Sequence, residues 1–231
     1  MYGHIVARPP RPDPELVERF RGIWTSTISD AMGRHGVMAA HVQPLFRPIG
    51  LLGVALTVLN YPNDNITTHR AVLLAQAGDV LVVDEGTGSD VGAFGHNTSL
   101  AARGRGVVGF VSSGCVRDAR LLREEGFPVF GRGTNPRSAQ KNTPGAINVP
   151  VQVGGVVVQP GDIVVGDDDG VVVVPLAIAP EIARVAAERQ QMEARQAQDI
   201  REGRQPLQIL YGADWVEEAL KDKMKLVEDD R

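Results

Sequence analysis

The sequence has little that would point to secretion, a membrane or a disulfide framework. Cys115 is the only cysteine among the 231 residues, so no intramolecular disulfide can form. The start of the chain lacks the apolar core of a secretion signal, and no apolar run approaches the length needed to cross a bilayer. We therefore expect a cytoplasmic protein with no membrane partner.

Basic residues are not in excess either. The 24 Lys and Arg residues are opposed by 28 Asp and Glu residues, which gives a net charge of −4. This balance lacks the basic footprint of a nucleic-acid-binding surface, so we expect no nucleic-acid partner. The hydrophobic fraction of 43% is ordinary for a soluble globular protein. The length allows one large domain or two small ones, either with a real core.

The order of the predicted elements changes halfway along the chain. The first half alternates strands and helices, and the second half is a meander of β-hairpins followed by helices. The predicted strands are 50–59, 80–83, 107–111, 127–130, 147–153, 156–158, 163–165 and 171–174. The predicted helices begin at Asp13, at Ser26 or Thr27 and at His96, or span 67–76, 117–125, 180–202 and 214–226. This mixture predicts one α/β domain with two sheet layers and helices on one side.

The stretch from Asp84 to Arg120 contains the strongest functional signal. It holds a buried strand end, a loop with four glycines, a helix start near His96 and a second strand that leads to Arg117 and Asp118. Glycines let the backbone approach a ligand closely, and a helix start offers free N–H groups and a partial positive charge. Arginine matches a carboxylate with its planar fork, and aspartate can hold a hard divalent cation. Together these residues predict a pocket for a small, metal-bound carboxylic acid.

Nucleotide-binding loops do not fit this stretch. Gly86 and Gly88 are followed by Val91, where a dinucleotide fingerprint requires glycine, and the helix does not begin at once. The Gly-Lys-Ser/Thr ending of a phosphate-binding loop is also absent.

Each candidate residue has a plainer interpretation as well. Arg117 and Asp118 could be a surface arginine beside a helix N-cap, and His96 could be an ordinary helix-start histidine. Cys115 fits a buried small side chain better than a nucleophile, because no third orienting group is evident. His69, on a helix after Asn65, fits packing or capping better than catalysis. The acidic run 167–169 with Gly170 lacks the ligand spacing of an EF-hand and predicts a hairpin turn.

The segments Gly95-His96 and Gly114-Cys115-Val116-Arg117-Asp118 resemble a known family. They are similar to the class II pyruvate aldolases that cleave 4-hydroxy-4-methyl-2-oxoglutarate and 4-carboxy-4-hydroxy-2-oxoadipate. The same family includes RraA, the regulator of ribonuclease E activity. The similarity covers nearly the whole chain. The family motif is an acidic residue, twenty arbitrary positions and then Arg-Asp; here the spacing is kept, but His96 stands at the acidic position.

The resemblance implies roles for named residues. Asp118 would bind Mg²⁺ or Mn²⁺ with water completing the shell. Arg117 would bind the pyruvyl carboxylate or keto oxygen, with help from the backbone N–H groups of Asn97 and Thr98. Gly95 and His96 would be substrate-binding residues as well. Catalytic roles would fall to Arg117, to His96 in place of the acidic residue, and to Glu193 from the C-terminal helix of a neighbouring subunit.

The implied function is a divalent-metal-dependent lyase that releases pyruvate from a 4-hydroxy-2-oxo acid and also decarboxylates oxaloacetate. The alternative is a non-catalytic, RraA-like regulator that binds a ribonuclease. The aspartate after Arg117, which RraA lacks and this chain keeps, favours the enzyme, as does the long C-terminal helix.

The implied fold is an α/β three-layer ββα sandwich of the RraA-like, swivelling-domain type, with N-terminal and C-terminal helices. We expect a single domain over residues 1–231, with 180–231 forming a helical extension at a subunit interface. The thin apolar stripe of the helix after Pro180 and the family likeness both predict a homotrimer or homohexamer.

Overall fold

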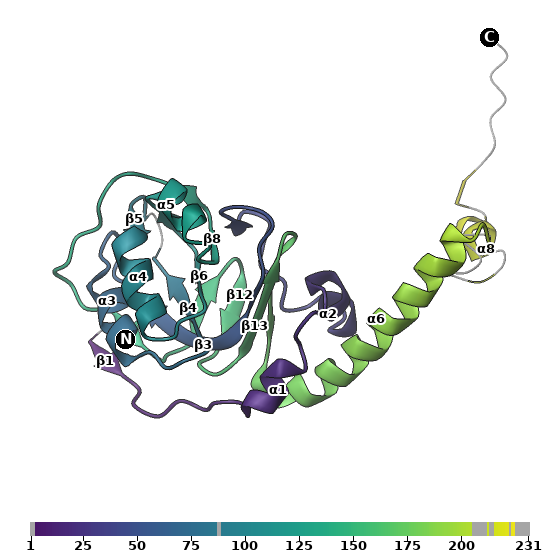
Figure 1. Cartoon of the computed structure of the whole chain (residues 1–231), viewed down its shortest axis with the longest axis horizontal. Helices are drawn as coiled ribbons and strands as arrows, with labels where there is room; N and C mark the ends of the chain where they lie inside the picture. The colour runs from purple at the N-terminus through teal and green to yellow at the C-terminus, as the bar shows by residue number, and fades with distance from the viewer. Residues whose placement is uncertain (1–2, 87–88, 205–211, 213–214, 222, 225–231) are drawn as a thin grey trace, which may run out of the picture. The chain divides into compact units, whose positions relative to one another are not determined.

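The computed structural model describes residues 3–86, 89–204, 212, 215–221 and 223–224 (Figure 1). Gly88 of the predicted loop, and residues 214, 222, 225 and 226 of the predicted last helix, lie outside this range. The chain divides into two compact units, Met1–Ala187 and Glu188–Arg231. In the described part of the chain, no helix has the length and apolar character needed to cross a membrane.

Four parallel strands form the centre of the main sheet. They lie side by side in the order β3 (Leu51–Leu59), β4 (Asp79–Asp84), β6 (Gly109–Ser112) and β8 (Val129–Gly131). Their sequences are rich in valine and other apolar residues, as expected for strands that are covered on both faces. The predicted strands at 50–59 and 80–83 are confirmed, and the predicted strand 107–111 is displaced to Gly109–Ser112.

Shorter strands complete the edges of this sheet. β1 (His4–Ile5) pairs with β10 (Ala146–Ile147), which pairs with the end of β3, and β2 (Gln43–Pro44) pairs with β8. The start of β3 pairs with β13 (Ile163–Asp167), which forms a hairpin with β14 (Gly170–Val174). The turn predicted at 167–170 is confirmed, because Asp167 and Gly170 are the last pair of that hairpin.

Helices α3 (Ile66–Leu74), α4 (His96–Gly104) and α5 (Ala119–Glu124) follow the central strands and cover one face of the sheet. Alternation along β4 separates the two faces. Leu81 and Val83 pack in the helix-side core with Phe110, while Val80 and Val82 belong to the core on the other face. This period of two fixes which face each strand residue occupies.

The second face is covered by β structure. The hairpin of β11 (Val151–Val153) and β12 (Val156–Val158) packs there together with residues of β13 and β14. Outside β13 and β14 lie α1 (Pro14–Glu18), α2 (Thr25–Ala31) and the first turns of α6 (Ala179–Arg201), which follows the 3₁₀ turn Leu176–Ile178. The three-layer ββα arrangement with an N-terminal helical part is thus confirmed.

A small sheet of β5 (Gly92–Phe94), β7 (Cys115–Val116) and β9 (Gly133–Thr134) was not predicted. Residues 92–94 and 133–134 fall within segments that the sequence indicated as loops. Arg117 and Asp118 therefore follow β7 rather than the buried strand β6, which ends at Ser112. Two- and three-residue strands are too short for a periodic pattern, and only their mutual pairing defines them.

In the second unit, α6 continues to Arg201, and α8 spans Trp215–Leu220. Glu193 lies on α6 and forms an ion pair with Arg189, with 2.8 Å between its carboxylate and the guanidinium Nε. The predicted subunit-interface role of residues 180–231 stays a prediction.

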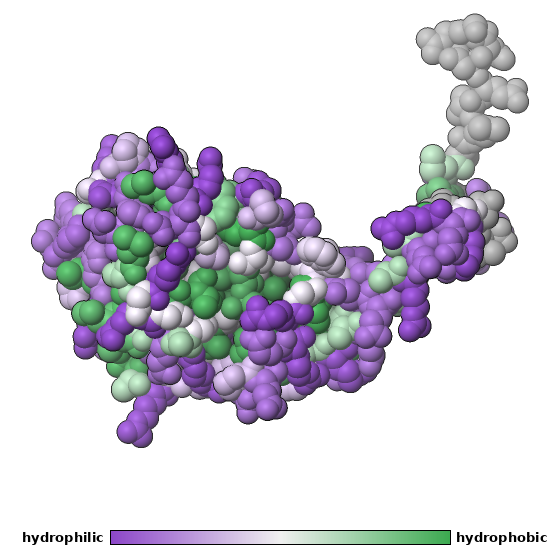
Figure 2. Space-filling view, in the orientation of Figure 1, coloured by the Kyte–Doolittle hydropathy of each residue, from purple (hydrophilic) through white to green (hydrophobic). Residues whose placement is uncertain are grey.

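The surface drawn in Figure 2 is mostly hydrophilic, with a hydrophobic area in the middle of the face in view. Exposed apolar side chains of the first unit include Ile5, Val6, Leu73 and Val157. Single exposed apolar residues are normal on soluble domains and carry no functional assignment here.

Candidate functional site

The parallel pairing of β5 with β7 brings the two halves of the predicted motif together. Phe94 lies opposite Val116, and the backbone N–H of Arg117 donates to the carbonyl oxygen of Phe94 at 2.9 Å. Gly95, at the N-cap of α4, and Arg117 therefore follow neighbouring strands at the same edge of the small sheet. The sequence predicted a pocket formed by these segments, with Arg117 and Asp118 at the end of strand 107–111; in the structure they follow β7 instead.

Glycine at position 95 is required by close packing. Its φ of −151° is ordinary extended backbone, so the requirement is spatial rather than conformational. A Cβ atom there would lie 2.5 Å from Oδ2 of Asp118 and 2.9 Å from Cγ of Arg117. Gly92 is crowded in the same way by the backbone of Asn135 and by Cβ of Arg117. These glycines let β5 approach the arginine and aspartate directly.

Asp118 has an unusual backbone conformation. Its φ of 59° and ψ of 35° place it in the left-handed region, which is uncommon for residues other than glycine. It occupies the N-cap of α5 but makes no side-chain capping bond, so the carboxylate is not used as the helix cap. Oδ2 instead accepts the backbone N–H of His96 at 3.1 Å. Strained backbone of this kind often marks functional positions.

Arg117 is held from two sides. Its Nε lies 3.5 Å from Oδ2 of Asp118, and its Nη1 donates to Oγ of Ser138 at 2.5 Å. Both charged side chains remain partly exposed, at 40% for Arg117 and 35% for Asp118. An ion pair at this exposure adds little to stability, so the fold does not depend on these two charges.

A cavity of about 200 Å³ opens onto these groups. Its lining residues are Asn65, His69, Gly92, Ala93, Gly95, Asn97, Thr98, Arg117, Asp118, Ser138, Ala139 and Lys141. Five residues predicted from the sequence thus line one cavity: Gly95, Asn97, Thr98, Arg117 and Asp118. The first turn of a helix leaves its N–H groups without intrahelical acceptors, so Asn97 and Thr98 can offer theirs.

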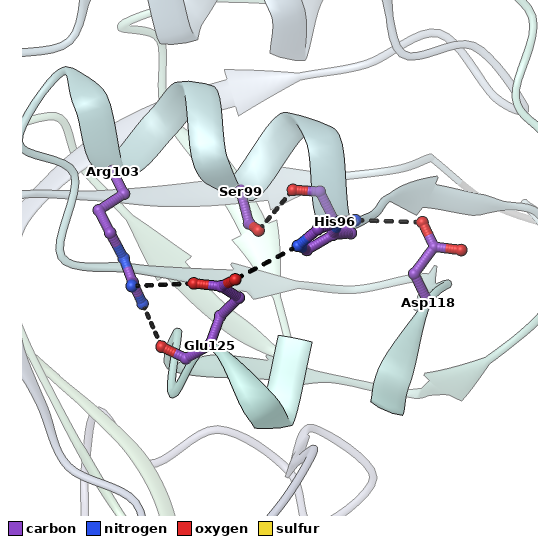
Figure 3. Close-up of polar contacts among 5 residues, drawn as sticks. All are labelled: His96, Ser99, Arg103, Asp118 and Glu125. Carbon is purple, nitrogen blue, oxygen red and sulfur yellow. Dashed lines mark hydrogen bonds and ion pairs between the residues drawn. The ribbon is translucent and has the colours of Figure 1, made fainter. Parts of the chain in front are cut away.

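His96 contributes to this site mainly through its backbone. Figure 3 shows its N–H directed at Asp118 while the imidazole is directed at Glu125, the residue after α5. Nε2 lies 3.6 Å from Oε1 of Glu125, and it is buried with no hydrogen-bond partner in the described structure. Arg103 holds Glu125 in turn, donating to its carbonyl oxygen at 2.6 Å. The imidazole is not among the groups that line the cavity.

Four lining residues with polar side chains were not predicted as site residues. Asn65 and His69 come from the start of α3, and Ser138 and Lys141 come from the polar segment after β9. The spacing of four residues between Asn65 and His69, typical of one helix face, was the only local signal. Ser138 and Lys141 lie far from α3 in sequence, so only the tertiary structure reveals them.

Asp64 attaches the segment that carries Lys141 to the start of α3. Its Oδ2 accepts the N–H groups of Asn142 and Thr143 at 2.7 and 2.9 Å, and its Oδ1 accepts that of Ile66 at 2.9 Å. Burial alone would raise the pKa of Asp64, but these three backbone donors outweigh it and hold the pKa below its usual value. Asp64 therefore stays ionised and fixes one side of the cavity.

The cavity residues that could bind a metal ion fit a cation that keeps most of its water ligands. In the part of the chain that the structure describes, no group of three or more His, Cys, Asp or Glu side chains could hold a metal ion. Among the described residues, Asp118 is the only acidic one that lines the cavity. Mg²⁺ commonly binds through one or two carboxylates and retains several waters, so a site built on Asp118 fits it. A structural zinc site, which needs four protein ligands, does not fit.

Comparison with known families and sequences gives a consistent result. A family model described as "RraA-like: Aldolase/RraA" matches residues 25–173. A protein of Halalkalibacterium halodurans named "Putative 4-hydroxy-4-methyl-2-oxoglutarate aldolase" is 35% identical over 76% of this chain and 84% of its own length. A protein of the same name from Burkholderia multivorans is 38% identical over 57% of this chain and 82% of its own length.

Two solved structures have the same fold. An uncharacterized protein from Pseudomonas syringae gives a TM-score of 0.79 at 26% identity, covering 88% of this chain and 96% of its own. RraAS2 of Streptomyces coelicolor, described as an unusual member of the RNase ES inhibitor RraA protein family, gives 0.73 at 33% identity. That match covers 80% of this chain and 97% of RraAS2.

Proposed function

This chain belongs to the RraA-like family, and from that membership we propose that it is a divalent-metal-dependent lyase. The reaction is the retro-aldol cleavage of a 4-hydroxy-2-oxo acid with release of pyruvate, accompanied by decarboxylation of oxaloacetate. The α/β fold is RraA-like, in agreement with the structural neighbours. The relatives named as aldolases support the lyase assignment, while RraAS2 belongs to a family named for ribonuclease inhibition.

The observation that carries the proposal is the convergence of Arg117, Asp118 and the α4 start on one cavity. Arg117 provides a planar fork for a carboxylate, and the N–H groups of Asn97 and Thr98 lie at the positive end of a helix. Lys141 adds a second positive charge to a cavity with one carboxylate. A small dianionic acid therefore suits this site better than a neutral ligand.

Asp118 would hold the Mg²⁺ or Mn²⁺ ion. The N–H of His96 fixes one carboxylate oxygen at 3.1 Å and so orients the group toward its ligand. A bound divalent cation supplies positive charge where negative charge develops on the keto oxygen. Arg117 contributes its own charge at the same end of the substrate, and Ser138 keeps the guanidinium in place. His96 remains a catalytic candidate at the family's acidic position.

The proposal is tested by pyruvate release coupled to lactate dehydrogenase. The substrates are 4-hydroxy-4-methyl-2-oxoglutarate and oxaloacetate, each with Mg²⁺ and with EDTA. We expect metal-dependent release from both. Release that is unchanged by EDTA and by Mg²⁺ would contradict the metal-dependent mechanism, and release from oxaloacetate alone would reduce the assignment to a decarboxylase.

The likeness to RraAS2 supports a second candidate, a regulator that binds a ribonuclease. Asp118 distinguishes the two candidates. Its strained backbone beside Arg117 is expected in a metal-binding active site, whereas a non-catalytic binding protein does not need it. Tight ribonuclease binding in a pull-down, together with no affinity for Mn²⁺, would favour the regulator.

Assembly is part of the lyase proposal. We expect a homotrimer or homohexamer in which Glu193 of one subunit completes the site of its neighbour. Light scattering that gives a monomer would remove the proposed catalytic role of Glu193.

A further inference from the structure

Helix α3 provides a side of the cavity that we call the α3 wall, consisting of Asn65 and His69. Asn65 is the N-cap residue, and the N–H of His69 donates to its carbonyl oxygen at 3.1 Å. Both residues line the same cavity as Arg117 and Asp118. Residues four apart lie on one face of a helix, so both side chains reach the cavity from α3.

Each residue of the α3 wall has a buried polar atom without a hydrogen-bond partner in the described structure. These atoms are Oδ1 of Asn65 and Nε2 of His69. Asn65 is only 6% exposed, and its amide nitrogen already donates to the carbonyl oxygen of Ala93 at 2.6 Å. Leaving a buried polar atom unsatisfied destabilises a folded protein. Two such atoms beside one cavity are unusual in a folded protein and call for an explanation.

The surroundings of His69 favour its neutral form. Burial lowers the pKa of the imidazole, and the positive charge of Lys141 lowers it further. Arg117, Asp118 and Lys141 line the cavity with it, and His4 and Arg70 line an apolar groove on which His69 also borders. Cations thus outnumber the single carboxylate around the ring. A neutral imidazole has one ring nitrogen free to accept a proton.

His96 is placed differently from His69. Its imidazole is directed at Glu125, which Arg103 holds, and it does not line the cavity (Figure 3). Of the two histidines near the site, only His69 is therefore among the described residues that line the cavity with Arg117 and Asp118.

On the basis of the proposed lyase function, we propose that His69 is the catalytic base that accepts the proton of the C4 hydroxyl group. The O–H bond breaks and its proton passes to the free ring nitrogen of His69. The C4–O bond becomes a carbonyl, and the electron pair of the C3–C4 bond forms the enolate of pyruvate. The imidazolium then returns its proton to C3. One molecule of 4-hydroxy-4-methyl-2-oxoglutarate thus yields two of pyruvate, with no oxidant or reductant.

The test compares His69→Gln with His35→Gln. His35 is exposed and does not line the cavity, which makes it the matched control. We expect kcat for 4-hydroxy-4-methyl-2-oxoglutarate to fall about 10²–10⁴-fold in His69→Gln, the usual contribution of a proton-transfer group. The control should retain wild-type kcat. Melting temperatures of both variants verify that they are folded.

A second variant separates proton transfer from structure. Added imidazole should restore part of kcat to His69→Ala in a concentration-dependent way, which a packing role would not allow. In the wild type, kcat should fall on the acidic side of the pH profile, where His69 becomes protonated, and His69→Gln should lack this decline.

The outcomes distinguish this inference from the proposed function. A His69→Gln enzyme with kcat within about threefold of wild type, beside an inactive Asp118→Ala enzyme, overturns the role of His69 alone. Loss of kcat in His69→Ala without imidazole rescue, together with an unchanged acidic limb in His69→Gln, also overturns it. A wild-type enzyme that releases no pyruvate overturns both proposals.

Discussion

The two sides of the cavity hold their polar groups in different ways. Arg117 and Asp118 are tied to each other, to Ser138 and to the N–H of His96, and they remain partly exposed. Asn65 and His69 of the α3 wall are more enclosed, and each has a polar atom with no partner in the described residues. The first side is organised by contacts within the protein, whereas the α3 wall keeps buried polar atoms without such contacts in the described residues. The difference agrees with the proposed roles, in which Arg117 and Asp118 bind the substrate and the metal ion and His69 accepts a proton.

Removing the carboxylate of Asp118 should have the largest effect. In Asp118→Ala we expect Mn²⁺ affinity to fall at least about 10–100-fold and metal-dependent turnover to be abolished. Titration of Mn²⁺ binding by electron paramagnetic resonance and the pyruvate assay measure the two effects. Glu124→Ala is the matched control, because Glu124 is an exposed carboxylate of α5 that pairs only with Arg120 in the described structure and does not line the cavity. Equal Mn²⁺ affinity in the two variants would contradict the assignment of Asp118.

Crowding the same side without removing a functional group should have a smaller effect. A methyl group at position 95 would lie 2.5 Å from Oδ2 of Asp118, so Gly95→Ala must displace the carboxylate. We expect kcat/KM to fall about 10–100-fold, as misplacement by an ångström commonly does. Gly104→Ala, at the other end of α4, has nothing within 4 Å of the added atom and should behave as wild type. A normal kcat/KM in Gly95→Ala would show that the close approach is dispensable.

The smallest effect on turnover is expected for a buried acid outside the cavity. Glu85 is 1% exposed, accepts from Nδ2 of Asn60 at 3.0 Å and does not line the site. Burial raises its pKa from 4.5 to about 7. The folded state therefore binds this proton more tightly than the unfolded state, and stability falls as pH rises from 4.5 to 7 and then levels off.

Replacing Glu85 with glutamine should remove this loss. At pH 8, Glu85→Gln should be more stable than wild type by roughly 3 kcal/mol, while near pH 4 the difference should disappear. Urea unfolding of both proteins at the two pH values measures this, and kcat should stay within about twofold. An equal stability difference at both pH values would show that Glu85 is not the titrating group. A large loss of kcat would show that Glu85 is needed for turnover although it lies outside the cavity.

The sequence predicts those elements that depend on residues close together in the chain, and it misses those that depend on pairing between distant segments. β3 and β4 and the helices after them were predicted because valine-rich runs, turn residues and capping residues are local signals. Asp13 is one example, since it caps α1 by accepting the N–H of Glu15 at 2.9 Å. The small sheet was not predicted, because β7 and β9 have two residues each and exist only through pairing.

The site shows the same limit. Gly95, Asn97, Thr98, Arg117 and Asp118 were predicted together because they belong to one motif with fixed spacing. His69 was interpreted as a packing or capping residue, since a single helical histidine gives no local sign of an adjacent cavity. Its environment depends on Lys141, which Asp64 brings to the start of α3 through contacts across more than seventy residues.

Exchange of the pyruvate methyl protons with D₂O, followed by proton NMR, tests the central claim most directly. It requires only that the site form the enolate of pyruvate, whatever the physiological substrate is. We predict that the methyl signal disappears in the presence of Mg²⁺ and persists with EDTA or with Asp118→Ala. A folded wild-type protein that binds Mn²⁺ and pyruvate but leaves the methyl signal unchanged would contradict the lyase assignment.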